Sequence, residues 1–218
     1  MGKKRVLHFE GKEADVSWDG RLCMHMEECW RDQSELFKLG RRPFGQPDLV
    51  STDHMLEVAR RCPSGAIVYS PHGNSPVETA EEENTVRVAP DGPLYITGNL
   101  DVEGAEDDMP SVRFRAALCR CGLSKNKPFC DASHVEAGFK DTGAVGQSGQ
   151  ILSETGGSLT IGAAPDGPLL LNGNFTIQSG AGRSTWTGVK AALCRCGQSK
   201  NKPFCDGSHK NAGFKSDN

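Results

Sequence analysis

The sequence lacks an uninterrupted apolar run of about 18 residues, so it predicts no membrane-spanning helix. Its first residues are basic but are not followed by the apolar stretch of a signal peptide, and we therefore expect a cytoplasmic protein. The net charge is only −3, which gives no general attraction to nucleic acid or to a membrane surface. We find no glycine-rich phosphate loop, nucleophile elbow or zincin helix, and we expect the protein not to be an enzyme.

Residues that build a hydrophobic core are also scarce. Only 36% of the 218 residues are apolar and 6% are aromatic, whereas 26 are glycine. A chain of this composition would be marginally stable if it divided into small units, because small domains bury a smaller fraction of their surface. Metal binding is one way to supply the missing free energy, since binding to a site that exists only in the folded state stabilises that state.

Cysteine, in contrast, is abundant. The nine cysteines fall into three groups of three. Their odd number and the absence of an export signal make metal binding a better interpretation than a disulfide framework.

Two of these groups form one cassette that occurs twice, at an offset of 75 residues. Each cassette supplies three thiolates and one imidazole. The candidate ligands are Cys119, Cys121, Cys130 and His134 in the first copy, and Cys194, Cys196, Cys205 and His209 in the second. Soft sulfur ligands with one nitrogen select zinc, copper(I) or an iron–sulfur centre over calcium or magnesium.

The duplication extends beyond the cysteines. Residues 116–134 and 191–209 are identical at 17 of 19 positions, and the sequence Ala-Pro-Asp-Gly-Pro-Leu occurs upstream in both copies. We divide the chain into residues 1–77, 78–148 and 149–218, the last two being the repeats. The polar and glycine-rich stretches 70–83 and 143–150 are predicted to be exposed linkers.

Local patterns predict the elements of each unit. Alternating apolar residues predict strands near 86–88, 94–96 and 114–118, and near 159–161, 169–171 and 189–193. Residues 32–35 form a candidate capping box for a short helix that bears Leu36 and Phe37. A second helix is predicted from Ser51 to Arg61. Cys130 and His134 are expected one helical turn apart, where both could face one metal centre.

Spacing leaves zinc and iron–sulfur open. The pattern Cys-x-Cys-x2-Ser-x3-Pro-x-Cys-Asp-(Gly/Ala)-Ser-His, however, closely resembles the CDGSH iron–sulfur (NEET) family. This resemblance implies a [2Fe–2S] cluster in each copy, in which Cys119 and Cys121 hold one iron while Cys130 and His134 hold the other. The second copy would use the corresponding four residues. Ala132 replaces the family glycine, and we expect this change to be tolerated unless the position needs a positive φ.

The resemblance also implies an architecture. NEET proteins form an intertwined pair of cluster-binding units beneath a β-rich cap. Two copies in one chain can form that pair internally, so we expect an α+β fold with a β-rich pseudo-dimer and a monomeric protein with internal pseudo-twofold symmetry.

Residues 1–77 carry the third group, Cys23, Cys29 and Cys62, and resemble a divergent single-cluster ferredoxin-like α+β domain. A Cys-Pro pair such as 62–63 is familiar from bacterial ferredoxins. Three cysteines suit a [3Fe–4S] cluster. His25 could complete a [4Fe–4S] site, but we favour its interpretation as a surface histidine, and an empty domain is a further alternative.

We therefore expect a protein that transfers electrons or donates [2Fe–2S] clusters, with a redox protein or an apo iron–sulfur acceptor as its partner. Replacing thiolate by imidazole on one iron raises the reduction potential, as in Rieske centres. The alternative is a structural zinc module used for protein interaction, which would carry zinc and no sulfide.

Overall fold

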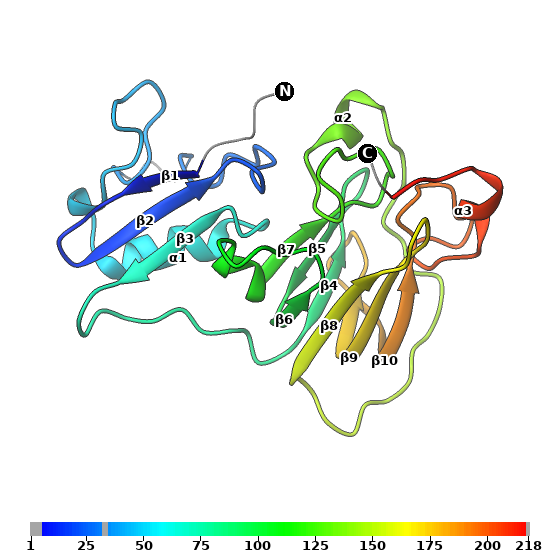
Figure 1. Cartoon of the computed structure of the whole chain (residues 1–218). Helices are drawn as coiled ribbons and strands as arrows, with labels where there is room; N and C mark the ends of the chain where they lie inside the picture. The colour runs from blue at the N-terminus through cyan, green and yellow to red at the C-terminus, as the bar shows by residue number, and fades with distance from the viewer. Residues whose placement is uncertain (1–5, 32–34, 217–218) are drawn as a thin grey trace.

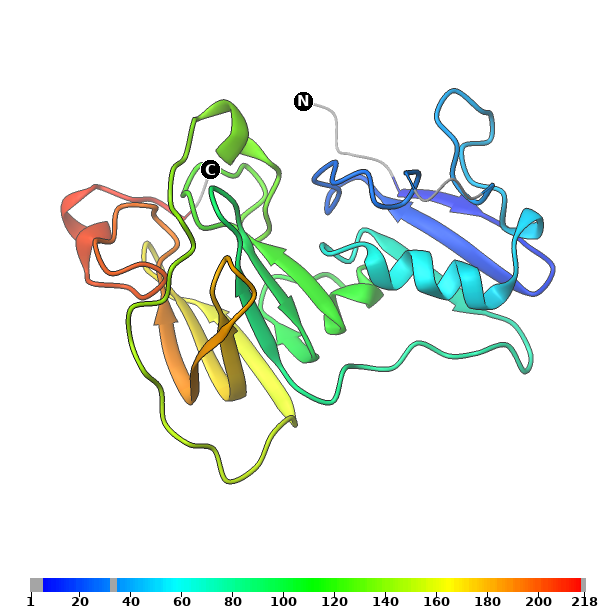
Figure 2. The ribbon, with the colours of Figure 1, turned by 180° about the vertical axis from the view of Figure 1, so that it is seen from behind.

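The computed structural model describes residues 6–31 and 35–216 of the chain. Its described part is β-rich with few helices, in an α+β arrangement (Figure 1). A small N-terminal unit lies beside a larger unit formed by the two repeats, and an extended segment connects them along one side (Figure 2). No helix within the described ranges has the length and apolar character that crossing a membrane requires.

The N-terminal unit is a three-stranded antiparallel sheet covered by one helix. Its strands, in spatial order, are β1 (Val6–Phe9), β2 (Ala14–Asp19) and β3 (Ile67–Pro71). Helix α1 (Thr52–Arg61) begins where the Ser51 hydroxyl accepts a hydrogen bond from the His54 amide, as expected of an N-cap, and it ends at Cys62. The predicted second helix is confirmed. A short 3-10 turn, η1 (Pro47–Leu49), precedes it.

The predicted helix around Leu36 and Phe37 is wrong. Its capping residues 32–34 lie outside the described residues, and from Glu35 onward the chain forms turns and one β-bridge between Phe37 and Gly45. The cause is a tertiary packing contact. Phe37 is buried and stacks on Phe44 at 5.0 Å, which a helical path could not achieve. The Arg41 guanidinium closes the loop by donating to the Glu35, Leu36 and Phe44 carbonyls.

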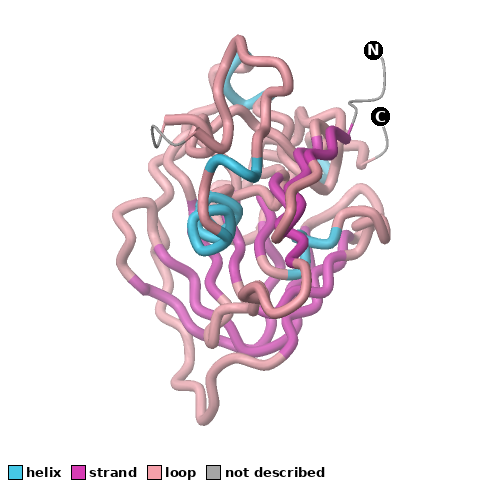
Figure 3. The backbone as a smooth tube through the Cα atoms, turned by 90° about the vertical axis from the view of Figure 1, so that its left-hand side faces the viewer, coloured by secondary structure: helices cyan, strands magenta, loops and turns pink. Residues whose placement is uncertain are grey.

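The repeats form one seven-stranded sheet. The first contributes β4 (Thr85–Val88), β5 (Leu94–Thr97), β6 (Asn99–Val102) and β7 (Arg115–Leu118). The second contributes β8 (Ser158–Ala163), β9 (Leu169–Gln178) and β10 (Ser184–Leu193). The predicted strands are confirmed, whereas β6 and the outer halves of β9 and β10 were not predicted. A 3-10 turn, η2 (Pro110–Arg113), precedes β7, and the one-turn helices α2 (Ser133–Glu136) and α3 (Ser208–Asn211) follow the cysteines (Figure 1). Strands and loops make up most of the described chain, and helices make up little of it (Figure 3).

The two repeats exchange strands reciprocally. Strand β6 leaves the first repeat and pairs in parallel with β8 of the second, while the outer half of β9 leaves the second repeat and pairs in parallel with β4 of the first. The register is equivalent on both sides, because Thr85 faces Thr176 and Thr160 faces Asp101 at the repeat offset of 75. Each repeat therefore completes the sheet of the other.

The linkers are held more firmly than their composition predicts. Strand β3 already includes the first residues of the stretch 70–83, and the buried Glu78 carboxylate pairs with the Arg115 guanidinium. In the second linker the Gln150 amide donates to the Thr187 carbonyl at 2.8 Å. Residues 143–150 contain no helix or strand, as predicted.

Candidate metal centres

Each repeat brings its four candidate ligands together as two pairs. In the first repeat the Cys119 and Cys121 sulfurs lie 3.8 Å apart, and the Cys130 sulfur lies 3.4 Å from His134 Nδ1. The second repeat reproduces both distances, 3.8 Å between its first two sulfurs and 3.4 Å from Cys205 to His209 Nδ1. The sequence-predicted ligands thus meet in the predicted combinations.

These distances suit one metal ion per pair. Two thiolates bound to one tetrahedral metal at about 2.3 Å lie about 3.8 Å apart. Within the described ranges, however, no group of three or more histidine, cysteine, aspartate or glutamate side chains converges closely enough to hold a single ion. The arrangement is therefore one of two separate pairs. All nine cysteines lie in the described part of the chain, and none is in a disulfide.

The surroundings shift the thiol pKa values in opposite directions, and hydrogen bonding from Cys121 lowers the pKa of Cys119 to about 6, which favours one thiolate in the first repeat. Burial raises the pKa of Cys130 to about 12, and burial likewise raises the pKa of Cys194. Burial, followed by the positive charge of Arg120, lowers the pKa of His134 and so keeps its imidazole neutral, the form that binds metals. Three thiolates can be ionised together in such a site only if metal cations balance their charge, so we expect metal binding to release protons.

Backbone amides point at the sulfurs. The amides of Ala132 and Gly207 donate to the sulfurs of Cys130 and Cys205, each at 3.4 Å, and the Gln198 amide donates to Cys196 at 3.4 Å. Because α2 and α3 have only one turn, these local hydrogen bonds, rather than a helix dipole, offset the negative charge of bound thiolates.

The arginine between the first two cysteines is structural in both repeats. Arg120 and Arg195 are only 1% and 3% exposed, so neither is a solvated surface cation. Arg120 Nε donates to the Gly92 carbonyl at 2.9 Å, and Arg195 Nε donates to Gly167 at 3.0 Å. Each arginine thus fixes the repeated Pro-Asp-Gly-Pro turn to its ligand loop, which explains why the two motifs occur together.

An aspartate connects the ligand loop to the short helix that follows it. The Asp131 carboxylate accepts from the amides of Lys125 and Ser133, and Asp206 accepts from Lys200 and Ser208 in the same way. Although burial opposes it, hydrogen bonding from Ser133 and Lys125 lowers the pKa of Asp131. The aspartates stand one residue before the N-cap positions, which are Ala132 and Gly207 and have no side-chain capping hydrogen bond.

Position 132 does need a positive φ. Ala132 adopts φ 68° and Gly207 adopts φ 86°, both in the left-handed region. An L-residue there costs about 1–2 kcal/mol relative to glycine. Ala132 adopts this conformation nonetheless, so the first repeat has a conformational free-energy cost that Gly207 spares the second repeat.

The two repeat sites touch each other. A Cβ atom added to Gly122 would lie 2.9 Å from the Cys196 carbonyl oxygen, and one added to Gly197 would lie 2.7 Å from that of Cys121. Both glycines have positive φ, 85° and 78°. Glycine directly after the second cysteine thus lets the two ligand loops approach backbone to backbone.

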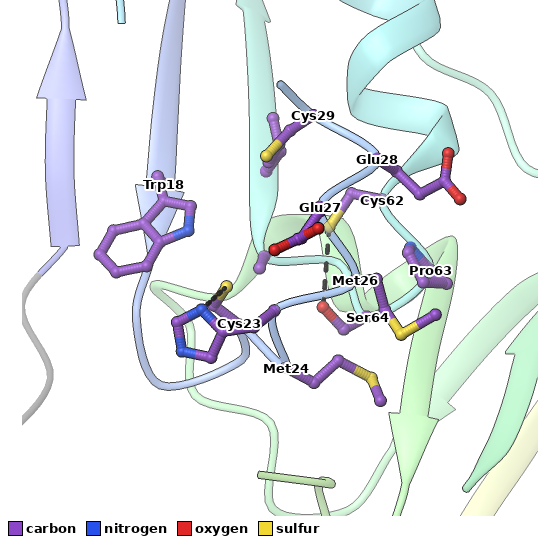
Figure 4. Close-up of a pocket in the computed structure, with 13 residues that line it drawn as sticks. Trp18, Cys23, Met24, Met26, Glu27, Glu28, Cys29, Cys62, Pro63 and Ser64 are labelled. Carbon is purple, nitrogen blue, oxygen red and sulfur yellow. Dashed lines mark hydrogen bonds between the residues drawn. The ribbon is translucent and has the colours of Figure 1, made fainter. Parts of the chain in front are cut away.

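The three N-terminal cysteines surround one cavity (Figure 4). Cys23 and Cys29 come from the loop after β2, and Cys62 ends α1. Trp18 and His25 also line the cavity. His25 is exposed, and its Nδ1 lies 4.0 Å from the Cys23 sulfur.

The same loop contacts the first repeat. Met24, which is 5% exposed, lies in one buried cluster with Ala117 and the candidate ligand Cys130, and Tyr95 packs against this cluster. The Tyr95 hydroxyl donates to the Met26 sulfur at 3.4 Å. Burial, with the nearby Cys130, raises the pKa of Tyr95 to about 12.

Sequence reasoning missed these contacts. A methionine beside a cysteine carries no local signal for a partner in another domain, and neither does a tyrosine in a strand. The glycine after each Cys-x-Cys pair was recognisable, because it occurs in both repeats at the same place.

Comparison with known proteins agrees with this division. The family described as iron-binding zinc finger, CDGSH type, matches residues 91–135 and again 166–210, and the family described as divergent 4Fe-4S mono-cluster matches residues 9–72. The chain is also 36% identical over 61 residues to the uncharacterized protein YjdI of Escherichia coli K12, and equally to that of strain O157:H7. The alignment covers 28% of this chain and 80% of each relative.

Two repeated CDGSH segments define the relationship, together with an N-terminal segment of the divergent 4Fe-4S type whose three cysteines line one cavity. The chain belongs to the CDGSH iron–sulfur family, as a tandem member with an N-terminal divergent 4Fe-4S single-cluster domain.

Proposed function

We propose that this protein relays electrons through three iron–sulfur sites held in one chain. Each repeat would hold a [2Fe–2S] cluster, with one iron on its Cys-x-Cys pair and the other on its Cys–His pair. The separation of the ligands into two pairs supports a diiron core over a single zinc ion, which requires four ligands around one point. When bound, such a cluster supplies one-electron redox chemistry.

The main support for a relay is that the N-terminal site contacts the site of the first repeat, which in turn contacts the site of the second repeat. The loop with Cys23 and Cys29 places Met24 in one buried cluster with Ala117 and Cys130, and the ligand loops of the two repeats meet at Gly122 and Gly197. Electrons could therefore pass from the N-terminal site to the first repeat and on to the second without leaving the protein.

The N-terminal site is proposed to hold a [4Fe–4S] cluster on its three cysteines, with His25 as fourth ligand. The match to the divergent 4Fe-4S family and the place of His25 on the cavity wall support this choice over a [3Fe–4S] cluster. A [4Fe–4S] cluster bound by four cysteines would not need His25 as a ligand, but only three cysteines line this cavity.

The pseudo-twofold exchange of strands supports a NEET-type pair formed within one chain, and we propose that the protein acts as a monomer. No catalytic role is part of the proposal. Its partner would be a redox protein, and neither nucleic acid nor a membrane is required.

Cluster donation is the second candidate function. It is favoured by the second repeat, where Cys205 is half-buried while its equivalent Cys130 is 3% exposed. A partly exposed ligand gives an acceptor thiol access to the iron.

One experiment separates the two functions. Oxidised protein is mixed anaerobically with a substoichiometric reductant, and EPR spectra are recorded over time, for the wild type and for Met24→Ala. A relay predicts that an electron first seen on one cluster is redistributed among the others, and more slowly in Met24→Ala. In parallel, incubation with apo-ferredoxin tests donation. Transfer of clusters without redistribution of electrons would reject the relay in favour of donation.

A further inference from the structure

Two hydrogen bonds join the first repeat to the loop after β2, which carries two of the three N-terminal cysteines. Asn126 donates from its side-chain amide to the Arg21 carbonyl at 2.7 Å. Tyr95 donates from its hydroxyl to the Met26 sulfur at 3.4 Å. One bond lies before Cys23 in the sequence and the other lies after it. Together they fix the part of the loop that presents this candidate ligand.

Both donors belong to the surroundings of the first metal site. Asn126 lies in the ligand loop itself, between Cys121 and Cys130. Its backbone amide donates to the hydroxyl of the buried Ser124 at 3.0 Å, which holds the donor in place. Tyr95 packs against the buried cluster that contains Cys130. The loop of the N-terminal site is therefore held by the same structure that presents the ligands of the first repeat.

The segment of the third N-terminal cysteine also rests on the first repeat. Gly65 follows Cys62 by three residues and has a positive φ of 73°. A Cβ atom added to Gly65 would lie 2.8 Å from the Arg115 carbonyl oxygen, on the strand that leads into the first ligand loop. Both chain segments that supply cysteines to the N-terminal site thus contact the first repeat.

The second repeat has the same loop conformation without these contacts. Asn201 is the equivalent of Asn126, and its backbone amide likewise donates to the Ser199 hydroxyl at 3.0 Å, but its side chain is exposed. Leu170 stands in the place of Tyr95 and has no hydroxyl. The amide of Asn126 is therefore a feature of every ligand loop, which the first repeat uses to hold the N-terminal unit.

A second polar contact in this region is weaker. The Arg21 guanidinium lies 2.9 Å from the carboxylates of Glu106 and Asp108 in the first repeat. These carboxylates are 68% and 61% exposed, and ion pairs at the surface contribute little to stability. Asn126 and Tyr95 are half-buried, so water competes less for their hydrogen bonds. The amide and the hydroxyl therefore determine where the loop lies.

We infer that Asn126 and Tyr95 are positioning residues of the relay, which hold the cysteine loop of the N-terminal site close to the first metal site. This inference rests on the proposed relay. Electron transfer weakens steeply with distance, because it depends on the overlap of donor and acceptor orbitals, so displacement of the loop slows the step. One electron leaves the N-terminal site and the site of the first repeat gains it. Asn126 and Tyr95 keep their protons, and neither is oxidised.

The test compares Asn126→Ala and Tyr95→Phe with the wild type, as full-length, cluster-loaded protein. Hydrogen exchange of the amides of residues 21–29 should become roughly fivefold faster in each variant, which is the effect of losing one ordinary hydrogen bond. Rapid-freeze EPR after a substoichiometric reductant should show that electron redistribution between the N-terminal site and the first repeat slows roughly tenfold, because the geometry of the step is lost. Excess dithionite should reduce the clusters of every variant to the same extent.

The matched control is Asn201→Ala, the same change at the equivalent, exposed position of the second repeat. It should leave both the exchange and the redistribution rates within about twofold of the wild type. Tyr95→Phe keeps the aromatic ring in place, so it carries the test if Asn126→Ala loses a cluster.

An unchanged redistribution rate in Tyr95→Phe and Asn126→Ala would overturn the inference, even if hydrogen exchange became faster, since the contacts would then hold the loop without serving the relay. Equal behaviour of Asn126→Ala and Asn201→Ala would overturn it as well. If the wild type itself shows no redistribution, the proposed relay fails, and this result is distinct from an unchanged rate in the variants alone.

Discussion

Replacing Arg115 with methionine is expected to weaken the attachment of the N-terminal unit by about 3–5 kcal/mol. Arg115 and Glu78 form an ion pair in which both side chains are nearly inaccessible, 5% and 6% exposed. Removing the guanidinium leaves the Glu78 carboxylate buried without its counter-charge, and this desolvated charge accounts for most of the cost. The Ile67 carbonyl, on β3, also loses a donor.

The measurement is limited proteolysis of the segment between β3 and β4, residues 72–84, under native conditions. Cleavage follows the population of the open form when opening is fast, so the rate should rise about a hundredfold or more in Arg115→Met. The control is Lys190→Met, the same change at the equivalent, exposed position of the second repeat, which should leave cleavage unchanged. A second variant, Glu78→Leu with Arg115→Met, removes both charges and should restore most of the resistance. Indistinguishable cleavage of Arg115→Met and Lys190→Met would show that the pair does not hold the units together.

Replacing Gly197 with alanine is expected to destabilise the paired sites by about 2–5 kcal/mol, which combines the cost of a positive φ with that of overpacking. The new methyl group would stand 2.7 Å from the Cys121 carbonyl oxygen, and backbone cannot move aside as a flexible side chain can. Because the contact is reciprocal, Gly122→Ala should behave in the same way.

Gly213→Ala is the matched control. Gly213 also has a positive φ, 61°, but nothing lies within 4 Å of the position of its added Cβ. Gly213→Ala should therefore destabilise the protein only by the free energy of placing alanine at a positive φ, about 1–2 kcal/mol. The readout is the temperature at which the visible absorbance of the loaded protein is lost. If Gly197→Ala and Gly213→Ala lower this temperature equally, the two ligand loops are not in contact.

Patterns confined to a few neighbouring residues predicted their part of the fold correctly. The Ser51 cap and the spacing of Met55 and Ala59 predicted α1, and alternation predicted β4 and β5. The four-residue spacing of Cys130 and His134 predicted that the two side chains would meet. In each case the decisive interactions lie within a turn of helix or between strands joined by a short turn.

Features that depend on distant residues were not predictable in this way. Residues 35–40 contain apolar side chains at helical spacing, but packing of Phe37 on Phe44 determines their path. The exchange of β6 and the outer half of β9 depends on a partner 59 or more residues away. The role of Arg120 has no local signal, because its carbonyl acceptor belongs to a turn almost 30 residues earlier in the chain.

Two diiron centres in the repeats are central to the proposed function, and counting iron and acid-labile sulfide in anaerobically purified protein tests for them most directly. The wild type should contain eight irons and eight sulfides per chain, on the order expected for two [2Fe–2S] clusters and one [4Fe–4S] cluster. The variant Cys29→Ser, which removes a ligand of the N-terminal site only, should keep about four of each. Two metal ions per chain in that variant, or zinc without sulfide, would contradict the account.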